Sequence, residues 1–90
     1  MSSPTTDSLI EYPCRFPIKV MGAHHPDFVD VIAGVARDFE PAFDATTITV
    51  TPSKGGNYLG LTLRVWVTDR AQLDALYIAL TGHPMVKVVL

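Results

Sequence analysis

Two adjacent histidines, His24 and His25, are the side chains of this sequence best suited to acid–base chemistry or metal binding. An imidazole changes its charge near neutral pH and is a common ligand of zinc. Nothing else nearby has the spacing of a set of metal ligands, so the alternative is a loop that helps to cap the following helix. His83 stands alone in a predicted turn, where we expect a structural role.

Residues 53–58, Ser-Lys-Gly-Gly-Asn-Tyr, have the composition of a loop that binds phosphate. Glycines leave backbone N–H groups accessible to an anion, and Lys54 adds a positive charge. The order of the residues is not that of a Walker motif, and the segment joins two predicted strands rather than a strand and a helix. Contact with a ligand or partner and a simple hairpin turn are therefore both open interpretations.

Catalysis has no positive support among the other residues. Cys14 is the only cysteine, and it has no activating neighbour except Arg15. A thiol becomes reactive only where its surroundings favour the thiolate. No paired carboxylates, Ser-His-Asp set or GxGxxG motif stands out. We therefore predict that the chain is not an enzyme and that it holds no metal or cofactor.

The length and composition favour one small domain that contacts a partner. Ninety residues, 48% of them hydrophobic, can form one compact core but not two. Only 18% are charged, against roughly 25% in average soluble proteins, so much of the surface must be neutral or apolar. The formal net charge of -2 argues against nucleic-acid binding. A single cysteine, with no signal sequence and no apolar run of about 18 residues, predicts a cytoplasmic protein that does not bind membranes.

The elements that must position these residues follow from the apolar spacing. Alternation from Phe16 to about residue 21 is typical of a half-buried strand, and Pro26 and Asp27 suit the first turn of a helix. A β-branched run at residues 46–51 indicates an edge strand, in which Ile48 and Val50 alternate with threonines. The residues expected to face the core are Phe16, Ile18 and Val20 in the strand, and Phe28, Val31, Ile32, Val35 and Phe39 in the helix, which ends before Pro41.

The second half of the sequence predicts a strand, a helix and a strand. Gly55 and Gly56 supply a turn, after which residues 58–67 alternate regularly and complete a hairpin. Asp69 with Gln72 three residues later resembles a capping box, and the helix that follows ends at residues 82–84. Residues 85–90 form the last predicted strand. The residues expected to face the core are Leu59, Leu61, Leu63, Val65 and Val67, then Leu73, Leu76, Tyr77 and Leu80, and finally Val86, Val88 and Leu90.

This βαββαβ order predicts an α+β, ferredoxin-like two-layer sandwich over residues 10–90. Right-handed crossovers give a four-stranded antiparallel sheet of order 4-1-3-2, with both helices on one face. Residues 1–9 are mostly polar, and we expect them to form a flexible tail. The outward residues of the uncovered face would be Arg15, Lys19, Met21, Thr62, Arg64, Trp66, Lys87 and Val89, with no acid among them.

An open sheet face with cations and an exposed tryptophan suits an anionic ligand or an acidic protein surface. Apolar contact would supply affinity and charge would supply orientation. One alternative is that the cations only keep the face soluble and its edges unpaired. Another is that Trp66 packs in a homodimer.

Three segments of the sequence carry a family resemblance. Their residues are Glu11, Tyr12, Pro13, Phe16, Lys19, Val20, Met21 and Gly22, then Ser53, Gly56, Asn57 and Tyr58, and finally Leu76, Tyr77, Leu80, Val86, Val89 and Leu90. Through them the sequence resembles the YbeD-like family of small, uncharacterised bacterial cytoplasmic proteins over about residues 10–90. It departs from that family at Lys54, which is displaced by one position because this chain has two glycines before Asn57. The resemblance implies a ferredoxin-like fold similar to ACT-type regulatory domains, an association with lipoate metabolism through gene neighbourhood, and no established activity.

Two functional hypotheses follow. The first is a non-catalytic regulatory or adaptor domain, ACT-like, that binds a protein partner or a small anionic metabolite through the open face or the hairpin loop. The second is a homo-oligomeric interaction module without a small-molecule ligand, which would pair through Trp66, Met21 and Val89. The candidate surface comprises Lys19, Met21, Ser53, Lys54, Gly56, Asn57, Tyr58, Arg64, Trp66 and Lys87.

Overall fold

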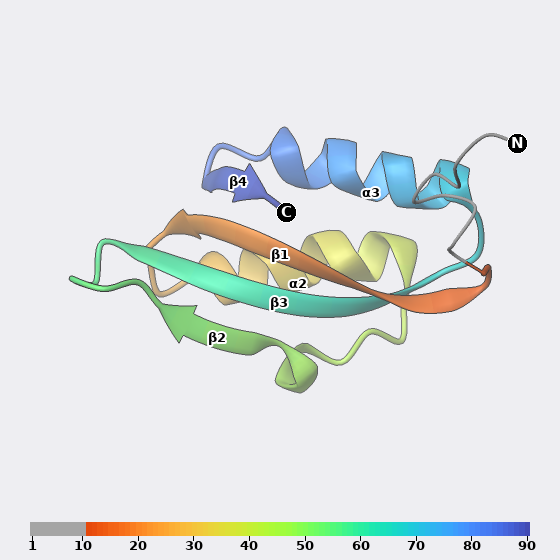
Figure 1. Cartoon of the computed structure of the whole chain (residues 1–90). Coiled ribbons are helices and arrows are strands. Elements are labelled where there is room, and N and C mark those ends of the chain that lie inside the picture. The colour runs from red at the N-terminus through yellow and green to blue at the C-terminus, as the bar shows by residue number, and fades with distance from the viewer. Residues whose placement is uncertain (1–10) are drawn as a thin grey trace, which may run out of the picture.

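The computed structural model describes residues 11–90, which have the predicted βαββαβ order. The strands form one antiparallel sheet of order β2-β3-β1-β4, the predicted 4-1-3-2 order read from the other edge. Figure 1 shows β1 and β3 as the long central pair, flanked by the shorter β2 and β4. The ferredoxin-like α+β fold is therefore confirmed, while the predicted tail lies outside the described residues. The elements are β1 (Cys14–Ala23), α2 (Phe28–Phe39), a 3₁₀ turn (Ala45–Thr47), β2 (Thr49–Pro52), β3 (Tyr58–Val67), α3 (Arg70–Thr81) and β4 (Val86–Val89).

The core lies between the helices and the inner face of β1 and β3. These strands pair without interruption from Cys14 opposite Val67 to Ala23 opposite Tyr58. The alternation read from the sequence is correct here, because all five predicted side chains of β3 are buried, as are Ile18 and Val20 of β1. On the helices, the buried residues are Phe28, Ile32, Ala33 and Ala36 of α2 and Leu73, Leu76 and Leu80 of α3.

Helix α2 contacts the core through smaller side chains than the sequence predicted. Val31, Val35 and Phe39 pack against the core but are only half-buried, whereas Ala33 and Ala36 are fully buried. Small side chains on the inward line let a helix backbone approach its neighbours closely, and the larger ones then fill the margins of the interface. The prediction followed the large apolar side chains at helical spacing and therefore overlooked the alanines.

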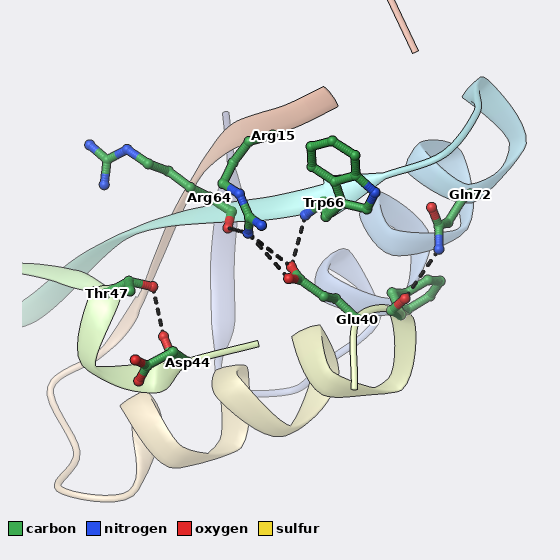
Figure 2. A network of polar contacts seen from close by, with 8 residues as sticks. Arg15, Glu40, Asp44, Thr47, Arg64, Trp66 and Gln72 are labelled. Carbon is green, nitrogen blue, oxygen red and sulfur yellow. Dashed lines mark hydrogen bonds and ion pairs between the residues drawn. The ribbon is translucent and has the colours of Figure 1, made fainter. Parts of the chain in front are cut away.

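The strand predicted at residues 46–51 is wrong in its first half. Ala45–Thr47 form a 3₁₀ turn, because the Asp44 carboxylate accepts hydrogen bonds from the Thr46 N–H (2.9 Å) and hydroxyl (2.7 Å). The Thr47 hydroxyl donates to the Asp44 carbonyl at 2.6 Å (Figure 2). Such local side-chain bonds compete with strand pairing. The bonds from Thr46 also hold the pKa of Asp44 below its ordinary value.

In the last strand, Val86 packs on the core as predicted, but the faces predicted for Val88, Val89 and Leu90 are wrong. Val89 lies opposite Val20 and Val88 opposite Met21, but Val86, not Lys87, lies opposite Gly22. Lys87 is therefore the extra residue of a β-bulge, which breaks the alternation of side chains. As a result Val89 packs on the core and Val88 is exposed, the reverse of the prediction. Leu90, expected inside, is also exposed because it exchanges backbone hydrogen bonds with the outward-facing Lys19 at 3.1 and 2.7 Å.

The predicted cap of α3 is present and gives a first testable expectation. The Asp69 carboxylate accepts the Gln72 N–H at 2.8 Å, and Gln72 Oε1 accepts the Thr68 N–H at 2.6 Å. We expect Asp69→Ala to lower the free energy of unfolding by about 1 kcal/mol in urea titrations. The control is Asp74→Ala, which removes an exposed pair with Arg70 on the same helix and should cost about 0.5 kcal/mol or less. Equal losses in the two variants would contradict the cap.

Candidate functional site

The candidate site lies on the face of the sheet that neither α2 nor α3 covers. Directly paired residues share a face, so the register assigns the outward side chains. One row across the sheet is Thr49, Thr62, Lys19 and Leu90, and the next is Thr51, Gly60, Met21 and Val88. Beyond them, Arg64 lies opposite Pro17 and Trp66 opposite Arg15.

A hollow of about 230 Å³ opens on this face between the two rows. It forms over Gly60, which has no side chain to fill the space between Thr51 on β2 and Met21 on β1. The lining is mostly apolar and includes Lys19, Met21, Thr51, Ser53, Thr62 and Leu90. The sequence reasoning named Lys19, Met21 and Ser53 as candidates but missed Gly60. The available signal was a glycine in the middle of a regularly alternating strand, a position that often marks a close approach by a ligand or backbone.

Three cations on or beside this face are unpaired. Within residues 11–90, the side chains of Lys19, Arg64 and Lys87 form neither a hydrogen bond nor an ion pair. Lys19 lines the hollow, Arg64 is two residues along β3 from Thr62, and Lys87 is exposed in the bulge of β4. Unpaired cations near apolar surface favour an anionic or acidic ligand.

At the other end of the face, an acid takes part, contrary to the prediction. Glu40, just after α2, receives two hydrogen bonds from Arg15 Nη1 at 3.1 and 3.2 Å and one from the Trp66 N–H at 2.9 Å (Figure 2). The same Arg15 nitrogen donates to the Arg64 carbonyl at 3.1 Å, and its guanidinium lies 5.6 Å from the centre of the Trp66 ring. We call Arg15, Glu40 and Trp66 the edge cluster.

The edge cluster satisfies a stretch of β3 that has no strand partner on its β2 side. β2 pairs with β3 only at residues 59–62, so beyond Thr62 the groups of β3 on that side lack a strand partner. The Glu40 carboxylate and the Arg15 guanidinium bond the Trp66 N–H and the Arg64 carbonyl instead. Unpaired edge groups would otherwise invite association with another strand. Arg15 is therefore neutralised, and the charge of the face is concentrated near the hollow.

The hairpin loop and the two histidines meet, but they do not form a cluster of ligands. The His24 ring hydrogen-bonds the Gly56 carbonyl, whereas His25 Nδ1 accepts the Asp27 N–H at 3.0 Å next to the start of α2. Ser53 closes the loop through bonds with Tyr58 at 2.9 and 3.0 Å. In the described part of the chain, no three His, Cys, Asp or Glu side chains gather to hold a metal ion.

The structure thus separates the predicted candidates into four groups. Lys19, Met21 and Ser53 meet at the hollow, and Arg64 and Trp66 lie farther along the same face. The other loop residues, Lys54, Gly56, Asn57 and Tyr58, are exposed at the β2–β3 turn, and Lys87 is in the bulge. No helix among residues 11–90 is long and apolar enough to cross a membrane.

Comparisons with known proteins agree with the resemblance noted in the sequence. Residues 7–90 match the family described as "Protein of unknown function (DUF493)". A UPF0250 protein of Paraburkholderia phymatum is 59% identical over 88 residues, which cover 98% of this chain and 99% of the relative. One from Leptothrix cholodnii is 60% identical over 87 residues, covering 97% and 96%, and one from Nitrosomonas europaea is 48% identical over 86 residues, covering 96% and 99%.

Proposed function

We infer the function of this chain from its geometry, because it belongs to the DUF493 family of YbeD-like UPF0250 proteins and neither its fold nor its relatives identify an activity. We propose that it is a non-catalytic adaptor or regulatory domain that binds a protein partner on its open sheet face. The observation that carries this proposal is that exposed apolar side chains and unpaired cations share the face opposite the helices.

The apolar part of the face supports a protein partner. Leu90 is 69% exposed, and Met21 and Val88 are also largely accessible around the hollow. Exposed apolar side chains that adjoin one another are typical of interaction sites, because their burial against a partner is favourable. The unpaired cations around them add orientation and a preference for acidic surfaces.

Self-association through this face is less well supported. Two copies stacked by their open faces would bring Lys19 and Arg64 of one copy close to cations of the other, and like charges at an interface are costly. Of the chain's own exposed acids, Asp30, Asp38 and Asp74 are on the helices, on the far side of the sheet. A different protein with acidic groups therefore suits the face better than a second copy.

A small metabolite is also less well supported. Pockets for small molecules usually have about 300–1,000 Å³, and the hollow is smaller than that range. The ACT-like ligand site and the link to lipoate metabolism that the family resemblance implies stay predictions, since no described side chain specifies such a ligand.

The test is a comparison of partners bound from native lysate, quantified by mass spectrometry. Lys19→Ala/Arg64→Ala should reduce recovery of the main partner by about tenfold, because it removes two charges of the interface. The control, Arg37→Ala/Arg70→Ala, removes the same charge from α2 and α3 and should retain the partner. If the control loses the partner as well, or if neither variant does, the open face is not the binding surface.

A further inference from the structure

Gly60 is a glycine that the fold does not require. Among the described residues, positive φ angles occur only at Gly55 and Gly56, so the backbone at Gly60 has a conformation open to any residue. A Cβ atom at Gly60 would meet one neighbour, the Thr51 carbonyl oxygen, at 3.4 Å, the lower limit of ordinary contact distances. The pairing of β3 with β1 and β2 is regular at this point.

A glycine inside a strand lowers stability. It lacks a side chain to pack against its neighbours and loses more backbone entropy on folding than other residues, and measured strand propensities differ by about 1 kcal/mol. A valine or threonine between Thr51 and Met21 would therefore be more stable. Glycine at position 60 leaves the hollow open, whereas any larger residue would fill it.

The dimensions and charge of the hollow indicate what enters it. Its volume of about 230 Å³ has room for one bulky side chain, its lining is mostly apolar, and Lys19 provides an unpaired ammonium group at the rim. Arg64 extends the positive charge along β3. In protein interfaces, a few aromatic or large apolar side chains inserted into such pockets supply most of the affinity.

We infer that the hollow over Gly60 is an anchor pocket for one bulky apolar side chain of the partner, presented by an acidic segment whose carboxylates lie against Lys19 and Arg64. The inference rests on the proposed function and specifies the chemistry of the partner. Complementary charge selects this occupant, since the unpaired cations of the face are met by no carboxylate within residues 11–90.

The first experiment uses a labelled probe peptide, Asp-Glu-Asp-Phe-Glu-Asp-Glu, titrated into the full chain and followed by fluorescence anisotropy and amide NMR shifts. We expect shifts at Lys19, Met21 and Gly60, and at least tenfold weaker binding when alanine replaces the phenylalanine of the probe. Equal binding of the two peptides would overturn the anchor. Phenylacetate, which has the ring and one carboxylate, is the third probe, and binding as tight as that of the peptide would overturn a protein segment in favour of a small anion.

The second experiment uses Gly60→Val, which fills the hollow from its floor. It should raise the urea midpoint of unfolding and weaken binding of the phenylalanine peptide at least tenfold. The control is Thr68→Val, at an exposed position just after β3, which should leave peptide binding unchanged. A lower midpoint would show that the fold needs Gly60, and unchanged binding would show that the hollow is not used; either result overturns the inference.

The two proposals fail in different ways. If Gly60→Val retains the lysate partner that Lys19→Ala/Arg64→Ala loses, the face binds the partner without an anchor, and only the further inference is wrong. If the double variant retains the partner, the proposed function itself is wrong.

Discussion

Gly22→Ala is expected to destabilise the domain by about 3 kcal/mol or more, the largest effect of any single methyl group that we predict. The added Cβ would lie 2.3 Å from the Met85 carbonyl oxygen and 2.4 Å from Cζ of the Phe28 ring. Phe28 is fully buried, and the Met85 carbonyl accepts the Ala23 N–H at 3.1 Å. Neither obstacle can be removed by rotating a flexible side chain, so the strand, the helix and the last loop would have to move apart.

The measurement is urea denaturation followed by circular dichroism, with Gly34→Ala as the matched control. Gly34 is in the middle of α2, and a Cβ there has no neighbour within 4 Å. Alanine should stabilise the helix at that position by up to about 1 kcal/mol. The same chemical change is thus expected to have opposite signs at the two sites. Neutral surface substitutions change stability by roughly ±0.5 kcal/mol. A loss within that range for Gly22→Ala would contradict the close packing of β1, α2 and the segment before β4.

Glu40→Ala is expected to cost about 2 kcal/mol and to promote self-association. The Glu40 side chain is only 14% exposed, and its loss leaves the Trp66 N–H without an acceptor on the open side of β3. The ion pair itself contributes less, because the Arg15 side chain is half-exposed and screened by water. With the edge cluster gone, β3 beyond Thr62 would present free backbone groups to other molecules.

Glu40→Gln separates these contributions. The glutamine amide oxygen can still accept the Trp66 N–H, so this variant should cost about 1 kcal/mol or less in urea titrations. Sedimentation velocity should show concentration-dependent association for Glu40→Ala but not for Glu40→Gln. Equal destabilisation by both variants would mean that charge, rather than satisfaction of the strand edge, is what Glu40 provides.

The edge cluster also changes which part of the open face is available to a partner. Trp66 was one of the candidates predicted from the sequence, but the Arg15 guanidinium lies over its ring and Glu40 accepts a hydrogen bond from its backbone N–H. Lys19 and the hollow over Gly60, by contrast, have no such contacts within residues 11–90. Binding is therefore expected near β2 and the end of β4 rather than at Trp66.

The sequence alone determined the parts of this protein that depend on local spacing. Alternation placed the five inward residues of β3, and Asp69 with Gln72 located the start of α3. The order of elements then left few possible topologies, so the fold followed. These features can be read because strand and helix periods and end caps involve residues only two to four positions apart.

The tertiary structure decided the features that depend on residues far apart in the chain. The bulge at Lys87 exchanged the faces of Val88 and Val89, and the missing partner of β3 brought Glu40 to Trp66, 26 residues away. The hollow over Gly60 exists only because β1 and β2 flank that glycine. Register, edge satisfaction and cavities are properties of paired strands, so no single segment specifies them. Only the pairing of the strands joined Gly60 to the predicted candidates Lys19, Met21 and Ser53 in one hollow.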